Sequence, residues 1–492
     1  MTQYESPWWQ VMSTHNHNLT PVLAAIFVLI GAAVLWYRST LSSSLPPGPR
    51  HLPILGYLPF LDPNLHTHFT NMARSYGPIF KIWLGSKLYV VINTQELAKV
   101  VVRDQDETFA NRSPTIAALA MSYGGQGIGW SNNNSSLRNL RKILVHQVLS
   151  NKNLEESGSI RRDEVRKMIR NVYSKMGAKI DINEISFSMI SNILTTMAWG
   201  KDNHFGVELQ IVISKIVEMI GRPNLSDFFP FLKWFDLQGV ERETKMHSKN
   251  LDRLLSNIIN DRIKSNSESL DVAARHEGKR DLLQFLLELK DQKDTTSLDI
   301  DKIKALLTVT KLYPFKSFTI CHMLSIIISK VASCVKLCCF QDTMIAGTET
   351  TTSLTQWAMA EIMHNRNIMK RVQEELADIV GTSNIVEESH LPKLKYLDAT
   401  IKETLRLHPG VPLLIPRSPS QTCTVGRRAC PGVPLATKVQ TYILASLLHS
   451  FEWSLPEGEE HDFSDVFSIA LKKRKPLVAV PSQRLSDVSL YM

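Results

Sequence analysis

The 492-residue chain has no internal repeat and, beyond residue 60, no glycine-, serine- or proline-rich linker that would divide it into domains. It has only six cysteines, and four of them lie between Cys321 and Cys339, which is not the spread of a disulfide framework. These absences favour one large domain in a reducing, cytosolic setting. The chain also has no nucleic-acid-binding motif, so we expect no nucleic-acid partner.

Charge and composition bound the remaining possibilities. With 43% hydrophobic and 21% charged residues, the chain is an ordinary globular sequence that can bury a large core. Its formal net charge of +9 suits a surface that meets anionic membrane headgroups or an acidic protein partner. A solvated excess of lysine would give the same value, and charge alone does not separate the two interpretations.

Near the N-terminus, residues 21–37 carry no charged side chain, which is the short end of what crosses a bilayer as a helix. Trp36 and Tyr37 close this run, and Arg38 follows. Because residues 1–19 contain no Lys or Arg, we expect a lumenal tail over 1–19, a single anchor over 20–37 and a cytosolic remainder. A cleaved signal peptide is the alternative, but the basic n-region is missing.

The positions of proline and glycine and the periodicity of hydrophobic residues predict the fold class. Prolines crowd residues 38–56, which predicts a stiff, non-helical hinge. Residues 78–102 alternate as a hairpin broken at Gly85 and Ser86, followed by a helix that Thr94 caps. Most of the chain from 137 to 380 has helical periodicity, and short strands return near the C-terminus. The sequence therefore predicts a mainly α fold with a small β portion.

An unusual polar stretch, "AGTETTTS" at 346–353, interrupts an apolar helix. Ala346 and Gly347 thin one face of this helix, and the acid–alcohol pair Glu349 and Thr350 follows. Because an unpaired acid in a buried helix costs several kcal/mol, such a pair indicates a use, such as orienting or protonating a bound group. A notch for packing another helix is the alternative interpretation.

Two further motifs follow in order. "KETLRLHP" at 402–409 places Glu403 and Arg406 three residues apart on a helix, a spacing usually found on solvated surfaces. "GRRACPG" at 426–432 surrounds a cysteine with glycines that allow turns near a planar group and with an arginine beside it. A lone cysteine is more often an inert core residue than a ligand, so the order of the motifs carries the argument.

This ordered set resembles the cytochrome P450 family, and the resemblance covers nearly the whole chain. The motifs are "LPPGPR" (45–50), "FANR" (109–112), "AGTETT", "KETLRLHP" and "GRRACPG". They look like those of plant microsomal A-type members, nearest to the group that oxidises terpenoids or phenolics. The resemblance implies a P450 haem domain over 57–492, single-pass anchoring in the endoplasmic reticulum membrane, and electrons from NADPH through a separate P450 reductase as partner.

The resemblance also implies roles for individual residues. The iron of haem b would be held by Cys430, the metal ligand, and Glu349 and Thr350 would deliver protons as catalytic residues. Glu403 and Arg406 would form a buried structural ion pair. The remaining cofactor-binding residues would be Arg141, Arg417, Arg428, Gly426, Gly432, Ala346 and Gly347.

The chain departs from the family in two places. Between Arg417 and Gly426 the family carries several dozen residues, including a meander whose arginine completes the Glu403–Arg406 pair, and here that segment is missing. Residues 309–341 are an insertion with an apolar run and the clustered cysteines, and removing them restores a continuous helix. Because its ends fit intron boundaries, we interpret the insertion as a retained intron; a membrane segment or a zinc site fits it less well.

The resulting hypothesis is a haem-thiolate monooxygenase that inserts one oxygen atom of O2 into a small hydrophobic plant metabolite. Its substrate would lie against the mainly apolar segments 116–122, 411–414 and 467–469. One alternative is a catalytically inactive P450-like product of a misassembled gene model or pseudogene, which the missing meander favours. Another is a haem enzyme that rearranges or dehydrates its substrate, which the acid–alcohol pair disfavours.

Overall fold

The computed structural model describes residues 24–28, 30–31, 45–122, 124–200, 206–268, 344–419 and 430–492. Among these residues, no helix combines the length and the apolar character that crossing a bilayer requires. Only residues 24–28 and 30–31 of the predicted anchor are described, and they are helical and exposed. The rest of that anchor, the predicted lumenal tail and the predicted insertion lie outside the described residues, as do Gly426 and Arg428.

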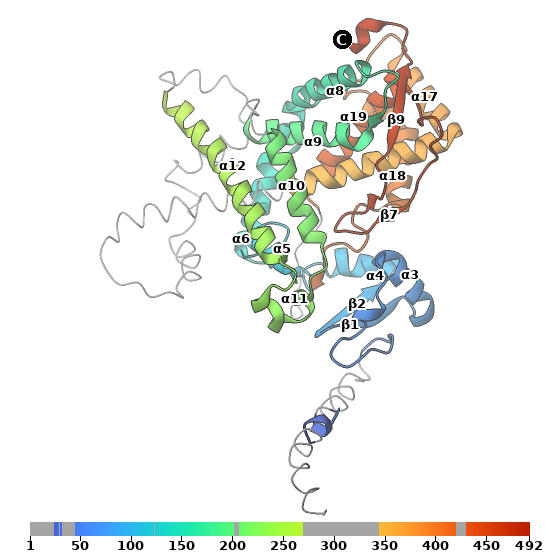
Figure 1. The fold of residues 1–492 in the computed structure, drawn as a ribbon. Helices are drawn as coiled ribbons and strands as arrows, with labels where there is room; N and C mark the ends of the chain where they lie inside the picture. The colour runs from blue at the N-terminus through green and yellow to red at the C-terminus, as the bar shows by residue number, and fades with distance from the viewer. Residues whose placement is uncertain are drawn as a thin grey trace, which may run out of the picture. The chain divides into compact units, whose positions relative to one another are not determined.

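The chain divides into two compact units, of which unit 1 contains residues 1–100 and 225–235 and unit 2 contains 101–224 and 236–492. Figure 1 shows the small sheet of unit 1 and the helices that dominate unit 2. The prediction of a mainly α fold with a small β portion is confirmed.

Unit 1 is built on the predicted hairpin. Strands β1 (Ile79–Leu84) and β2 (Lys87–Ile92) are antiparallel, with Leu84 opposite Lys87, so the turn is Gly85–Ser86 as expected. The Thr94 side chain accepts a hydrogen bond from the Leu97 amide and begins the next helix, which confirms the predicted cap. The described elements of this unit besides the hairpin are η1 (Leu58–Phe60), α3 (Leu65–Tyr76), α4 (Gln95–Lys99), α11 (Leu225–Phe228) and η4 (Pro230–Phe235).

The described part of the hinge, 45–56, is non-helical and lies against β1. The Lys81 amide donates to the carbonyl of Pro47 at 2.8 Å, and the Tyr57 amide donates to that of Trp83 at 2.6 Å. A Cβ at Gly48 would come within 2.1 Å of the Lys81 carbonyl oxygen, so only glycine fits there. A small apolar core holds the unit together; it contains Phe69, Met72, Phe80, Ile82 and Leu84.

Unit 2 contains most of the helices. Another helix covers 344–364, and the segment η2 (Val100–Asp104) connects the units in sequence. The other described helical elements are α5 (Ile116–Met121), α6 (Ser135–Ile143), η3 (Leu144–Val148), α7 (Asn151–Glu156), α8 (Gly158–Tyr173), α9 (Ile182–Trp199), α10 (Gly206–Gly221), α12 (Val240–Glu268), α17 (Arg366–Val380), η5 (Leu391–Lys393), α18 (Lys395–Leu407), α19 (Val433–Ser450) and η6 (Val488–Tyr491).

The strands of unit 2 are short and antiparallel. One sheet has the order β4–β9–β6, and two further pairs are β3–β5 and β7–β8. Their bounds are β3 (Asn111–Arg112), β4 (Ile180–Asp181), β5 (Arg417–Ser418), β6 (Phe451–Ser454), β7 (Asp465–Val466), β8 (Lys472–Lys473) and β9 (Val478–Gln483). The β3–β5 pair is the one that matters for the site, because it brings the "FANR" motif beside Arg417.

The core of unit 2 is formed largely by three apolar helices, α9, α10 and α19, together with helix 344–364. Every residue of α19 from 439 to 450 is buried. One charged group in this core is satisfied completely: Arg161 of α8, fully buried, donates to both carboxylate oxygens of Glu388 at 2.5 and 2.9 Å and to Ser157 Oγ at 2.8 Å. This network joins α8 to the segment that precedes α18.

Buried His449, at the end of α19, predicts a loss of stability in acid. Its Nε2 lies 3.0 Å from the carbonyl oxygen of Asn384, and burial lowers its pKa below the ordinary value of 6.5. The unfolded chain therefore binds more protons than the folded chain once the pH falls below about 6.5, so stability falls as the pH is lowered through that region. We expect His449→Gln to reduce the drop in the urea midpoint between about pH 7.5 and about pH 5.5.

The matched control is His146→Gln, because His146 is exposed. It should leave the pH dependence of the urea midpoint unchanged. An equal drop for His449→Gln and the unaltered chain would show that this histidine does not cause the acid sensitivity.

Candidate active site

The acid–alcohol pair lies on helix 344–364, as the sequence predicts. The Thr350 hydroxyl donates to the carbonyl oxygen of Ala346 at 2.6 Å, one turn back along the helix. Ala346 is exposed, whereas a Cβ at Gly347 would lie 2.9 Å from Leu194 Cδ1 of α9. Gly347 therefore fits the helix-packing alternative, and the exposed small residue is Ala346.

The buried carboxylate of Glu349 has partners that sequence reasoning missed. Lys472 Nζ, from β8, lies 2.5 Å from Glu349 Oε2, and Ser214 Oγ of α10 lies 3.5 Å from Oε1. Glu349 is buried, so Lys472 supplies the partner that a buried acid requires. The requirement that a buried acid be paired was the only signal in the sequence, and it did not identify Lys472.

Cys430 stands immediately before α19, the most buried long helix of unit 2. Its thiol is free and exposed, which excludes the alternative of an inert core cysteine. Gly432 has a φ of −82°, which any residue adopts, so this position does not require the conformational freedom of glycine. A Cβ there would lie 3.8 Å from Cys430 Sγ. This glycine thus keeps the space beside the sulfur open.

Two of the three predicted arginines gather around an aspartate. Arg417 Nη1 lies 2.6 Å from Asp106 Oδ1, with side chains only 11% and 4% exposed. Burial lowers the pKa of the half-buried Arg141 guanidinium, while the negative charges of Cys430 and Asp106 oppose that shift. Arg141 of α6 is therefore within electrostatic range of the thiolate and of the aspartate. No feature of the sequence had indicated Asp106.

The Glu403–Arg406 pair forms, but the expectation that it is buried is wrong. Arg406 Nε and Nη2 donate to the two Glu403 oxygens at 2.8 and 2.7 Å, and the hydrogen bond lowers the pKa of Glu403 and raises that of Arg406. The side chains are 55% and 67% exposed. Both charges are therefore solvated, and the pair is a surface ion pair.

These neighbours define the kind of ligand the site suits. Cys430, with its exposed thiol, precedes the largely buried α19. Arg141 and Arg417 share one aspartate, Asp106, so these three side chains carry a net positive charge. The buried Nε of Arg417 has no hydrogen-bond partner among the described residues, so it is a donor ready for an acid. A thiolate combined with donors for acid groups is the donor set of a haem-thiolate protein.

The comparisons agree with this class. The sequence model of the cytochrome P450 family matches residues 46–311 and 335–426. The chain belongs to the cytochrome P450 family. Its members are monooxygenases that use haem b and take electrons from NADPH through a reductase. The match is interrupted within the predicted insertion 309–341, whose origin as an intron stays a prediction.

Plant proteins are among the relatives. Geraniol 8-hydroxylase of Catharanthus roseus is 29% identical, covering 94% of this chain and 99% of that protein. Ferruginol synthase of Isodon rubescens is 28% identical, covering 94% and 98%. A zebra fish cytochrome P450 solved with abiraterone has a TM-score of 0.67 at 20% identity, over 86% of this chain and 100% of that one, which shows the fold. None of these matches supports the alternative of an inactive product.

The buried Asp106–Arg417 pair predicts a large loss of stability when one partner is removed. Arg417→Gln leaves the Asp106 carboxylate buried without its cation, which costs about 3 kcal/mol or more in the free energy of unfolding. The double variant Asp106→Asn/Arg417→Gln should recover part of that loss, and urea denaturation measures both.

The exposed pair supplies the comparison. Glu403→Gln should leave the urea midpoint unchanged, because both of its charges are in water. A loss for Glu403→Gln as large as that for Arg417→Gln would contradict the prediction that the buried pair, and not the exposed one, stabilises the fold.

Proposed function

We propose that this chain is a membrane-bound haem-thiolate monooxygenase that oxidises small hydrophobic plant metabolites, with terpenoids as the preferred class. The proposal is supported chiefly by the neighbourhood of Cys430, where a free thiol and Arg141 lie within electrostatic range of each other. The substrate class follows from relatives such as geraniol 8-hydroxylase, whose name gives a small hydrophobic alcohol as substrate.

The residues present fit haem b. Cys430 would hold the iron, and Arg141 and Arg417 would bind the two acid side chains of the haem, with the unpartnered Nε of Arg417 as one donor. Arg428 and Gly426 are proposed on the family motif alone, because they lie outside the described residues. When bound, a thiolate-ligated haem activates O2 with electrons that the reductase supplies.

Side chains of this chain would then supply the protons that the reaction needs. The Thr350 hydroxyl donates a hydrogen bond to the carbonyl oxygen of Ala346. Its oxygen can still accept a hydrogen bond from a group at the exposed face of the helix. Glu349, one residue earlier, can exchange a proton with its partners while Lys472 holds its carboxylate in place. The pair therefore places a proton source beside the residue, Ala346, that a flat ligand would approach.

The proposed substrate-lining segments carry apolar side chains, which suit a hydrophobic substrate. In the segment 116–122, α5 supplies the buried Ile116, and the segment 411–414 supplies Leu413 and Leu414, both exposed. Leu414 has a φ of 55°, a conformation in which leucine is strained and which is most often kept at functional sites. These segments are proposed to line the substrate.

Turnover tests the proposed chemistry. With a plant P450 reductase, NADPH and geraniol as the probe, the chain should form a hydroxylated product that requires O2. Thr350→Val should lower the product formed per NADPH consumed by about tenfold, because proton delivery is lost while electron transfer continues.

The control is Thr355→Val on the same helix, where the Thr355 hydroxyl makes the same kind of bond, to the Thr351 carbonyl at 2.9 Å. It should keep the ratio of product to NADPH. Equal ratios for Thr350→Val and Thr355→Val would contradict the role given to Thr350.

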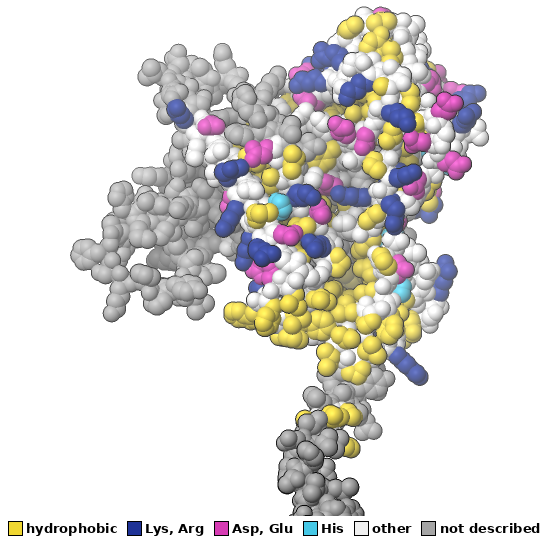
Figure 2. Space-filling model, in the orientation of Figure 1, with side chains coloured by type: hydrophobic (Ala, Val, Ile, Leu, Met, Phe, Trp, Pro, Cys, Tyr) yellow, Lys and Arg dark blue, Asp and Glu magenta, His cyan; other side chains and the backbone are white. Residues whose placement is uncertain are grey.

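We also propose that unit 1 dips into the membrane, in accord with single-pass anchoring in the endoplasmic reticulum. Its η4 segment carries Phe231, Trp234 and Phe235, all exposed, with Trp234 at 92%. The hinge side of the same unit exposes Ile54 and Phe60. Figure 2 shows a broad hydrophobic surface at this end. Exposed hydrophobic patches mark protein or membrane contacts, and the predicted anchor, which precedes the hinge in sequence, favours the membrane.

Fluorescence can test this insertion. In the full chain reconstituted into vesicles, brominated acyl chains should quench Trp234, so Trp234→Phe should reduce the quenched fraction of the emission. Trp453→Phe, which alters a half-buried tryptophan of unit 2, should leave it unchanged. Quenching that is indifferent to Trp234→Phe would place η4 outside the bilayer.

A further inference from the structure

One segment near the C-terminus connects the acid–alcohol pair with residues proposed to line the substrate. Residues 467–473, here called the strap, contain the proposed lining segment 467–469 and end in β8. Residues 467–471 lie outside the strands of the described structure, so no sheet ladder holds them. The position of this part of the strap therefore depends on individual contacts.

Leu471 is the first anchor of the strap. Its carbonyl oxygen accepts hydrogen bonds from Ser353 Oγ at 2.5 Å and from Trp357 Nε1 at 3.4 Å, both on the helix of the acid–alcohol pair. Its amide donates at 3.0 Å to the carbonyl oxygen of Gly410, directly before the proposed lining segment 411–414. Because Leu471 is 2% exposed, water cannot readily replace these partners, and losing one is costly.

Lys472 is the second anchor. Its Nζ lies 2.5 Å from Glu349 Oε2, which joins the strap to the acid of the pair. Glu349 and Ser353 are four residues apart in sequence, so both contacts lie on one face of helix 344–364. The strap is therefore held along one helical turn, and Thr350 follows directly after the first of the two contacts.

The other end of the strap lies against α10. A Cβ at Gly221, the last residue of α10, would come within 2.0 Å of Ser468 Oγ, so the helix leaves no room for a side chain there. Ile469 packs against the core of unit 2. Because Ile469 is only three residues from Lys472, a displacement of the strap at Lys472 also moves the proposed lining residues.

We propose that Lys472 and Ser353 are positioning residues for the oxidation, because they fix the proposed lining segment 467–469 relative to the acid–alcohol pair. The inference rests on the proposed function, in which that segment lines the substrate and the pair supplies protons. A displacement of about 1 Å between reacting groups costs about 100-fold in rate. Neither residue has to touch the substrate or the haem to have this effect.

Hydrogen exchange of the substrate-free full chain measures the anchoring without turnover. Lys472→Met keeps an unbranched side chain and removes the charge. It should raise the exchange rate of the Leu471 amide by about tenfold, because the bond of that amide to Gly410 opens more often when the ion pair is lost. Ser353→Ala should raise the same rate, because it removes a donor to the Leu471 carbonyl.

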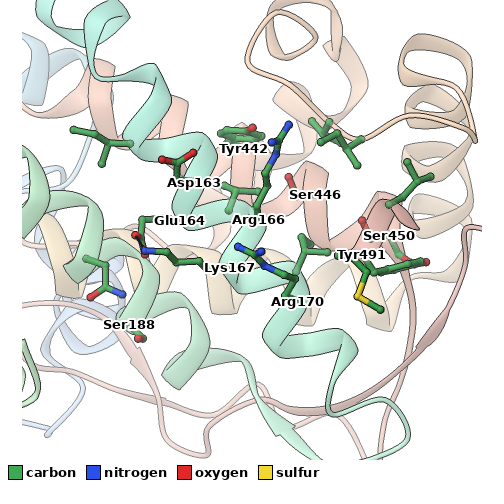
Figure 3. Close-up of a pocket in the computed structure, with 18 of the residues that line it drawn as sticks. Asp163, Glu164, Arg166, Lys167, Arg170, Ser188, Tyr442, Ser446, Ser450 and Tyr491 are labelled. Atoms are coloured by element: carbon green, nitrogen blue, oxygen red, sulfur yellow. Dashed lines mark hydrogen bonds and ion pairs between the residues drawn. The ribbon is translucent and has the colours of Figure 1, made fainter. Parts of the chain in front are cut away.

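Ser446→Ala is the matched control for Ser353→Ala, because both serines are buried on core helices. Figure 3 shows Ser446 among the residues that line a cavity between α8, α9 and α19, and no residue of the strap lines this cavity. Its Oγ has no hydrogen-bond partner in the described part of the chain. The substitution should therefore leave exchange of the strap unchanged.

Turnover of geraniol with NADPH and the reductase separates positioning from stability. A loss of stability alone lowers the amount of product without changing which products form. Lys472→Met should lower the share of the main hydroxylated product among all oxidised products by about threefold. Lys472→Arg, which keeps a cation within reach of Glu349, should restore that share. Lys245→Gln removes an exposed ion pair of α12 and should leave it unchanged.

Three results would each overturn the inference. Unchanged exchange of the Leu471 amide in Lys472→Met would show that the ion pair does not anchor the strap. An equal rise in exchange for Ser446→Ala and Ser353→Ala would assign the effect to general loosening of the core. An unchanged product distribution in Lys472→Met would show that the strap does not position the substrate. Absence of any product from the unaltered chain would instead be a failure of the proposed function itself.

Discussion

The ion pair between Asp106 and Arg417 is the interaction on which the candidate active site depends. The two side chains are 311 positions apart in sequence, yet they meet at 2.6 Å in nearly water-free surroundings. The pair holds the β3–β5 segment in place and keeps a negative charge near Arg141. The aspartate therefore offsets the positive charge of both arginines.

The apolar core provides the second constraint. Cys430 lies three residues before the first residue of α19, whose residues 439–450 are buried in this core. Helix 344–364 is buried in the same core and carries the acid–alcohol pair. The hydrophobic effect thus fixes helix 344–364 and α19, and the Asp106–Arg417 pair then positions the arginine side chain.

Local patterns were enough to predict part of this structure. The hairpin at 79–92, the Thr94 cap and the helical setting of Thr350 all follow from neighbours within a few residues, and each was confirmed. Asp106 and Lys472 were missed because their partners are distant in sequence, and periodicity carries no information about such pairs.

Family resemblance was informative only where this chain keeps the family's residues. It led to the expectation that Glu403 and Arg406 are buried, which the structure contradicts. Local spacing alone had suggested a solvated pair, which is what the structure shows. The roles that the resemblance gives to Cys430 and Thr350 stay predictions, and its expectation of burial is wrong at Glu403 and Arg406.

The central claim is that this chain binds haem through a Cys430 thiolate even without the meander. The most direct test is the carbon monoxide difference spectrum of the full chain, expressed with haem supply and then reduced. The account predicts a strongly red-shifted Soret band that Cys430→Ser abolishes. Absence of that band in the unaltered chain, or its survival in Cys430→Ser, would contradict the account.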